Sequence, residues 1–151
     1  MALDQSFVGR TYPPTRAHEV GREKIREFAA AINDRNPAYT DQEAARALGH
    51  QDVIAPPTFV FSLTFQEAEQ VVRDPKLGLD YDRVVHRDQK FMYVRPVRAG
   101  DVLSVTSTIE SIKSLAGNEV VGVRGEVRDS EADLVATVHT TLVARALEEG
   151  A

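Results

Sequence analysis

The chain has 151 residues, of which 42% are apolar, and it contains no cysteine. This length corresponds to about one domain, so we expect a single domain over residues 1–151 with a buried core. The net charge of −5 and the scattered distribution of 18 lysines and arginines argue against a nucleic-acid interface. The absence of cysteine excludes disulfides, thiolate nucleophiles and cysteine-based zinc sites.

Membrane, export and metal signals are missing from the sequence. No apolar segment approaches the roughly 18 residues of a membrane-spanning helix, and no basic segment is followed by an apolar run near the start. We therefore expect a cytoplasmic protein. His18, His50, His86 and His139 lack metal-ligand spacing, so no metal or other cofactor is predicted. His50 is interpreted as a loop residue and His139 as a structural one, whereas His86 is a candidate for a substrate entrance.

The first part of the chain predicts an extended segment followed by two helices. Two adjacent prolines forbid a helix within residues 1–18. Apolar residues then recur at helical spacing from Arg22 to Ile32. A short helix is expected over Asp41–Leu48, where Asp41 can cap the first turn and Gly49 can end the last one.

A third helix is predicted over residues 58–73, and its composition indicates that it is buried. Pro57 is expected in its first turn, where a missing N–H costs little. The first two turns are apolar nearly all round, which is typical of a helix enclosed by other elements.

After Gly78 the apolar pattern changes to a period of two, which predicts strands. The expected strands cover residues 83–95, 102–112, 119–128 and 134–145, with an irregularity around Arg87-Asp88 in the first. The last strand is apolar on both faces for much of its length, as expected in the interior of a sheet. The tail Glu148–Ala151 is expected to fray. Helices followed by strands indicate an α+β fold in which an antiparallel sheet wraps around the long helix.

The segment from Asp34 to Tyr39 follows the first predicted helix and combines an acidic residue, an Asn-Pro pair and a phenol. Turn statistics alone favour a plain interpretation, a helix end that runs into an Asn-Pro turn. A functional interpretation needs further matching segments. A second unusual segment supplies one of them, because Pro56 and Pro57 stand just before the long apolar helix.

Several segments in the same order resemble the MaoC-like hydratases and dehydratases of the hot-dog fold. The resemblance covers about residues 5–146, and its matching pieces are Phe28–Pro37, Asp41, Ala44–Gly49, Val53–Pro57, Gln89–Tyr93 and Arg95–Asp101. It implies a single hot-dog fold, with an antiparallel sheet wrapped around a long central helix. Members of that family remove water from (3R)-3-hydroxyacyl thioesters or add it to trans-2-enoyl thioesters. This chemistry needs a base, an acid and donors directed at the thioester carbonyl.

The chain departs from the family pattern at two independent places. Asp34 matches the family's Asp, but Tyr39 stands in place of its His, and a phenol titrates near 10 rather than near 6.5. Pro56 and Pro57 replace a His-Gly pair whose Gly N–H points at the thioester carbonyl, and proline has no N–H. The chain therefore resembles the non-catalytic, HadA-like subunit of heterodimeric actinobacterial (3R)-hydroxyacyl-acyl carrier protein dehydratases.

This resemblance implies an acyl-thioester-binding subunit of fatty-acid biosynthesis whose catalytic Asp and His come from a MaoC-like partner. Asp34 and Tyr39 are then degenerate catalytic positions. The implied substrate-binding positions are Asn36, Pro57, Thr58, Phe59 and Phe91. Two alternatives stay open, a self-sufficient hydratase that uses Asp34 and a non-enzymatic acyl-binding homodimer. Thioesters on acyl carrier protein and on CoA are both compatible with the sequence.

Two further groups of residues have alternative interpretations. Phe59, Phe61 and Phe65 of the third helix are expected in the core or along an acyl tunnel, and these positions overlap because such a tunnel runs beside that helix. Four basic residues could form a rim for a phosphopantetheine phosphate, or they could be ordinary strand-edge charges. These residues are Arg87, Lys90, Arg95 and Arg98.

Overall fold

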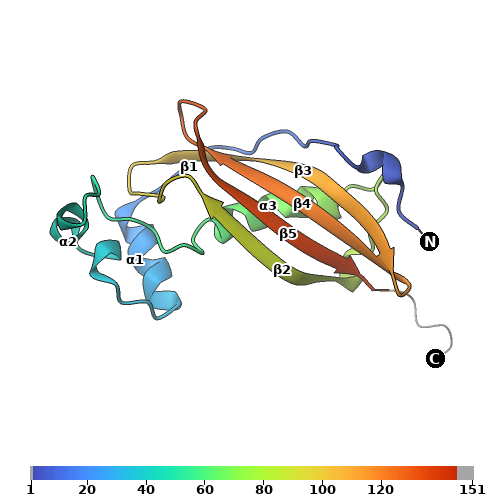
Figure 1. Cartoon of the computed structure of the whole chain (residues 1–151), viewed down its shortest axis with the longest axis horizontal. Coiled ribbons are helices and arrows are strands. Elements are labelled where there is room, and N and C mark those ends of the chain that lie inside the picture. The colour runs from blue at the N-terminus through green and yellow to red at the C-terminus, as the bar shows by residue number, and fades with distance from the viewer. Residues whose placement is uncertain (1, 146–151) are drawn as a thin grey trace.

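The computed structural model describes residues 2–145, and its strands form one antiparallel sheet that curls around a helix (Figure 1). The strand order is β1-β3-β4-β5-β2. The predicted α+β hot-dog fold is confirmed. The strands are β1 (His18–Glu19), β2 (Val84–Tyr93), β3 (Val102–Leu115), β4 (Asn118–Arg128) and β5 (Leu134–Ala144). The helices are α1 (Arg22–Ala31), α2 (Gln42–Ala47) and α3 (Phe61–Val72).

The four long strands lie where the alternating pattern predicted them. The register of β2 against β5 shifts between His86 and Asp88, which confirms the expected irregularity. Strand β5 pairs with β4 on one side and β2 on the other, so it is interior, as its two apolar faces predicted. Strand β2 is an edge strand of the sheet. The expected fraying of Glu148–Ala151 lies outside the described residues.

Helix α3 begins later than predicted. It starts at Phe61 rather than at residue 58, because residues 57–60 form tight turns instead. The Phe59 N–H donates to the Pro56 carbonyl at 2.9 Å, and the Phe61 N–H donates to the Thr58 carbonyl at 3.0 Å. Hydrogen bonds to the carbonyl three residues earlier are typical of a 3₁₀-helix, which is wound more tightly than an α-helix. The prediction that Pro57 lies in the first helical turn was therefore wrong.

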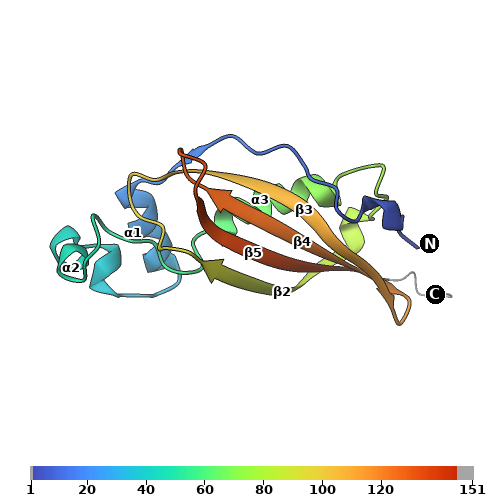
Figure 2. The same cartoon turned by 45° about the horizontal axis from the view of Figure 1, so that its top comes forward.

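Helices α1 and α2 lie beyond one end of the sheet, whereas α3 packs on its concave face against β3, β4 and β5 (Figures 1 and 2). Helix α1 ends one residue before the predicted Ile32. The predicted cap of α2 is confirmed, since the Asp41 carboxylate accepts hydrogen bonds from the N–H groups of Glu43 and Ala44. Gly49 follows with φ of +91°, a conformation that glycine adopts without strain.

The segment before α1 is mostly extended, as predicted, apart from a short 3₁₀ turn at Gln5–Phe7. It runs along β3, with the Gly9 N–H bonded to the Ile109 carbonyl and the Tyr12 N–H bonded to the Ser107 carbonyl, both at 2.8 Å. The segment therefore covers the outer edge of β3. No helix within residues 2–145 is long and apolar enough to cross a membrane.

Two groups of buried apolar residues hold the sheet, α3 and the first part of the chain together. One joins α1 and the turns before α3 to the strands and includes Ile25, Tyr39 and Phe59. The other joins the C-terminal end of α3 to the N-terminal segment and includes Tyr12 and Val71. The first group fixes the position of the Asp34–Tyr39 segment relative to the start of α3.

Candidate functional site

The Asp34–Tyr39 segment is a compact turn held by its own side chains. The Asp34 Oδ1 atom accepts the Asn36 N–H at 3.2 Å, and the Asn36 Oδ1 atom accepts the Ala38 N–H at 3.1 Å. Pro37 stands at the first position of the 3₁₀ turn Pro37–Tyr39, where no N–H is needed. Asn36 is therefore a turn cap, a role that the plain interpretation of this segment anticipated.

Tyr39 lies at the end of this turn with only 6% of its surface exposed. Burial and the nearby Asp34 carboxylate raise the pKa of the Tyr39 phenol, and Asn36 is also within hydrogen-bonding reach of it. An apolar environment and a neighbouring negative charge both disfavour the phenolate. Tyr39 therefore stays protonated at neutral pH and can donate a hydrogen bond, but it cannot act as a base there.

A cavity of about 350 Å³ opens beside Tyr39, between the turn before α3 and the end of β2. It is lined by Tyr39, Ile54, Ala55, Pro57, Tyr93, Val94, Arg95 and Pro96. The Tyr93 hydroxyl donates to the Pro57 carbonyl, so both residues form one wall. Burial also raises the pKa of Tyr93. We call this space the proximal cavity. Pro57 contributes a ring to it but no N–H donor.

Arg95 closes one side of the proximal cavity through an ion-pair network. Its guanidinium forms two hydrogen bonds with the Asp101 carboxylate, at 2.9 and 3.0 Å, and a third with Asp129 at 3.3 Å. These bonds raise the pKa of Arg95 further. The Arg98 N–H also donates to Asp101 at 2.9 Å. Arg95 is therefore a wall residue with its charge compensated, which favours the structural alternative over a phosphate rim.

Asp34 lies on the other side of the turn. It lines a separate polar hollow together with Arg26, Asn33, Arg35 and Thr40, among others, whereas the proximal cavity is lined by Tyr39. The turn that joins Asp34 to Tyr39 therefore separates the two spaces. Asp34 is nevertheless close enough to Tyr39 to raise the pKa of its phenol.

Of the five predicted substrate-binding residues, Pro57 alone lines the proximal cavity, beside Tyr39, which was predicted as a degenerate catalytic position. Asn36 caps the preceding turn, and Thr58 is exposed and outside the cavity lining. Phe59 is a core residue whose ring packs edge-on against Phe28 at 5.4 Å. Phe91 packs against the same core group without lining the cavity.

Several cavity residues have no separate signal in the sequence. Tyr93 and Arg95 belong to segments that match the family, but their contacts with Pro57 and Asp101 depend on how β2 packs beside the turn before α3. Such a contact joins residues far apart in the chain, so residue spacing does not predict it.

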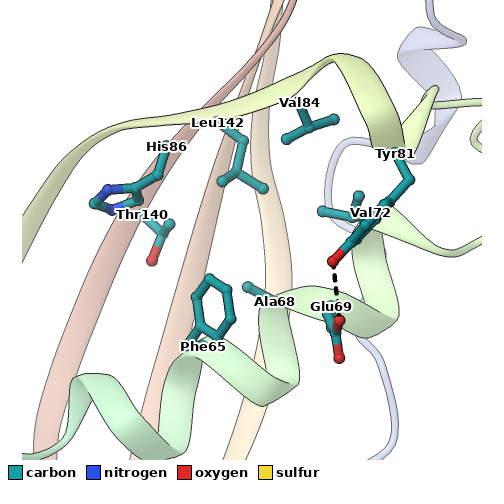
Figure 3. Close-up of a pocket in the computed structure, with 9 residues that line it drawn as sticks. All are labelled: Phe65, Ala68, Glu69, Val72, Tyr81, Val84, His86, Thr140 and Leu142. Atoms are coloured by element: carbon teal, nitrogen blue, oxygen red, sulfur yellow. Dashed lines mark hydrogen bonds between the residues drawn. The ribbon is translucent and has the colours of Figure 1, made fainter.

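A second cavity of about 180 Å³ lies between α3, β2 and β5 (Figure 3). It is lined by Phe65, Ala68, Glu69, Val72, Tyr81, Val84, His86, Thr140 and Leu142. His86 lines this cavity, and its predicted place at a substrate entrance stays a prediction. We call this space the distal chamber.

The other histidines do not meet at a site. His139 Nδ1 lies 2.6 Å from the Glu110 carboxylate, in line with the expected structural role. Among residues 2–145, no group of three His, Cys, Asp or Glu side chains is arranged to hold a metal ion.

The antiparallel sheet curled around α3 is a hot-dog fold of the MaoC-like dehydratase type. A family model described as "FAS1-like, dehydratase domain region" matches residues 6–138, and the chain belongs to this family. A UPF0336 protein of Streptomyces griseus is 74% identical over 149 residues, which cover 99% of each chain.

Two solved structures are similar over most of the chain. One is the HadBC (3R-hydroxyacyl-ACP dehydratase) complex from Mycobacterium tuberculosis, with 33% identity, a TM-score of 0.82 and coverage of 95% of this chain and 99% of that one. The other is a MaoC-like dehydratase with 32% identity and a TM-score of 0.87, which matches 95% of this chain and 44% of that longer one. These similarities agree with the family that the sequence motifs indicated.

Proposed function

We propose that this chain is the acyl-thioester-binding subunit of a (3R)-3-hydroxyacyl dehydratase or hydratase complex in cytoplasmic fatty-acid biosynthesis. A MaoC-like partner subunit supplies the catalytic Asp and His, and residues 1–151 form one MaoC-like domain. The observation that supports this most is the buried, protonated Tyr39 at the position of the family's His.

Elimination of water requires removal of a proton from C2 of the acyl chain. A base for this step needs a pKa near the working pH and must lie within hydrogen-bonding reach of the proton that it removes. Tyr39 lines the cavity but holds its proton, whereas Asp34 faces the polar hollow and is already an acceptor for the Asn36 N–H. Of these two candidate bases, the one that lines the cavity holds its proton and the other lines a different hollow.

The start of α3 supports the same proposal. A thioester carbonyl gains negative charge during the reaction and needs donors that point at it. At the cavity, Pro57 has no N–H, and its carbonyl accepts the Tyr93 hydroxyl. Loss of one such donor lowers the rate of related reactions by about 10²–10³-fold. Binding of an acyl thioester does not need these donors, so the cavity suits a binding role.

An edge strand and an exposed aromatic residue favour assembly with a second hot-dog subunit. Strand β2 lies at the edge of the sheet, and its outward residues Val85 and Met92 are exposed, as is Phe65 on α3. Unpaired edge strands with apolar neighbours are surfaces that proteins normally cover. One of the similar structures is a two-subunit complex, HadBC. A partner sheet paired with β2 would cover these groups.

The proposal is tested by co-expression with a hot-dog protein that has an intact Asp-x-Asn-Pro-x-His segment and is encoded next to this chain. The purified pair is expected to hydrate crotonyl thioesters, whereas neither chain does so alone. In the pair, the partner's catalytic Asp→Asn change should abolish activity, while Asp34→Asn in this chain should leave it within about twofold. Loss of activity on Asp34→Asn would instead support a self-sufficient hydratase. Tight acyl binding without turnover in any pairing would support a non-enzymatic acyl-binding homodimer.

A further inference from the structure

A buried carboxyl on α3 has no role in the proposed acyl binding. Glu67 is only 3% exposed, and it lines neither the proximal cavity nor the distal chamber. Its Oε2 atom accepts the side-chain amide of Gln70 at 2.6 Å. Burial raises the pKa of the Glu67 carboxyl, because an enclosed carboxylate loses its hydration. The segment that encloses Glu67 therefore contacts a group whose charge depends on pH.

The N-terminal segment encloses this carboxyl. We call residues 12–20 the strap, and they run along the outer edge of β3 (Figures 1 and 2). Thr15 and His18 of the strap lie close to the Glu67 carboxyl and partly offset the effect of burial on its pKa. The strap and α3 therefore meet through polar side chains at this level, beside an otherwise apolar core.

His18 carries the charge that acts on Glu67 from the strap. The β3 residues that pair with this part of the strap, Leu103 and Val105, are apolar and fully buried. On α3 itself, the carboxyl contacts Gln70, which is uncharged. A protonated His18 favours the ionised form of Glu67. Two titratable groups, one on each side of the contact, therefore set its charge.

The strap is anchored at both ends and has fewer hydrogen bonds in its middle. The N–H groups of Tyr12 and Val20 each donate to a backbone carbonyl at 2.8 Å, and both side chains are buried. Between them, Pro13 and Pro14 have no N–H to donate. The Thr15 N–H forms a longer bond of 3.2 Å to β3. Residues 13–17 can therefore move away from α3 while the two ends stay in place.

Two hydroxyls near Glu67 oppose the closed position of the strap. The Oγ atoms of Thr15 and of Thr64, which lies one turn before Glu67 on α3, are buried and have no hydrogen-bond partner within residues 2–145. Enclosed polar groups without partners favour a state in which water reaches them. The balance between the closed and open strap is therefore sensitive to the charge on Glu67.

We propose that the strap is a latch controlled by one proton, which closes on α3 when Glu67 is protonated and opens over residues 13–17 when Glu67 is ionised. A neutral acid fits the enclosed position, whereas a carboxylate there needs the hydration that opening supplies. The latch belongs to the fold itself and does not depend on what the cavities bind.

The pH window follows from the two states of Glu67. In the open state the carboxyl is hydrated and titrates near its ordinary value of 4.5, whereas in the closed state its pKa is raised. Below about pH 4.5 the carboxyl is protonated in both states, so closure is most favoured there. Opening should increase as pH rises through the raised pKa, by up to about tenfold per pH unit, and should be constant above it.

Hydrogen exchange of the Thr15 amide in the full chain tests the latch. Nuclear magnetic resonance measures its protection factor between pH 4 and pH 8, after correction for the intrinsic pH dependence of exchange. Protection of Thr15 is expected to fall within the window described and then to level. The amides of Tyr12 and Val20 are the internal references, and their protection should not follow this fall.

Three variants assign the effect to its groups. Glu67→Gln keeps a neutral side chain of the same shape, so Thr15 should stay protected at every pH. His18→Gln removes a charge that favours the carboxylate, so the fall should extend to higher pH. Glu69→Gln is the matched control, because Glu69 lies on the same helix but pairs with Arg73, and it should behave as the unchanged chain.

Thermal unfolding checks that each variant folds. Thr15 protection that does not change with pH in the unchanged chain would overturn the inference, as would an unaltered fall in folded Glu67→Gln. An equal fall at Tyr12, Thr15 and Val20 would also overturn it, because the whole strap would then detach together. If Glu67→Gln does not fold, the shift expected in His18→Gln decides, and its absence would overturn the latch.

Discussion

Replacing Arg95 with methionine should destabilise the protein strongly, because the guanidinium compensates a buried carboxylate at the wall of the proximal cavity. Asp101 is only 7% exposed and accepts both bonds of the Arg95 fork. Methionine fills a similar space but removes the charge, so Asp101 keeps only the Arg98 N–H and a distant contact with the Arg98 guanidinium at 3.9 Å.

The size of the effect follows from this geometry. Removing one partner of a buried pair costs about 3–5 kcal/mol of the unfolding free energy. The Arg95 side chain is 25% exposed, and water can therefore reach part of the vacated space, so we expect the lower end, about 3 kcal/mol. Lysine should restore only part of this loss, because an ammonium cannot form the two-pronged contact with a carboxylate.

Urea unfolding at neutral pH measures the difference, with Arg128→Met as the control. Arg128 pairs with Glu126 at 3.2 Å, but the two side chains are 40% and 34% exposed. Loss of such a surface pair should cost under about 1 kcal/mol. If Arg95→Met and Arg128→Met destabilise equally, the structural role of Arg95 is wrong. A selective loss of binding to phosphopantetheine thioesters in Arg95→Met, without loss of stability, would favour the phosphate rim.

Three further outcomes are expected. Burial raises the pKa of Glu67 from its ordinary value of 4.5, so the contribution of this group to the unfolding free energy should be largest below about pH 4.5 and should fall as pH rises through the raised pKa. Glu67→Gln should remove this contribution in urea titrations at several pH values. Tyr12→Phe loses a 2.9 Å hydrogen bond to the Asp74 carboxylate and should cost about 1.5–3 kcal/mol by the same assay, a value that a loss under about 0.5 kcal/mol would contradict. Tyr39→Phe keeps the apolar wall and should change acyl-thioester affinity by less than about threefold in calorimetry, whereas a tenfold loss would assign the hydroxyl a direct contact with substrate.

The sequence predicted the sheet well because β3 and β4 alternate apolar and polar residues over most of their length. Val121, Val123 and Val127 of β4 are all buried on one face, as this pattern requires. The irregularity at Arg87-Asp88 was also visible, since the alternation breaks there. The alternation recurs at many positions, and a shift of the strand pairing by one residue would move the apolar side chains to the other face, so the register is well specified.

The start of α3 was predicted less well, because apolar residues before a helix look the same as apolar residues inside it. Phe59 and Val60 are buried in tight turns rather than in the helix, and no capping side chain marks the boundary. The pair Pro56-Pro57 indicated a break in the chain but did not say how many residues separate it from the first helical turn.

The candidate site shows the same division between local and distant contacts. The Asp34–Tyr39 turn follows from its own residues, as the hydrogen bonds of Asp34 and Asn36 show. The cavity walls depend on packing between distant segments, such as Tyr93 against Pro57. The spacing of residues along the chain does not predict such packing, so only the structure shows these contacts.

The central claim is that this chain can bind an acyl thioester but cannot move its proton. It is tested most directly by adding trans-2-enoyl thioester to the purified chain without a partner and measuring binding and hydration in the same sample. Saturable binding is expected without detectable hydration. Hydration at about 1 s⁻¹ or faster, in the range of ordinary enzymes, would contradict the account.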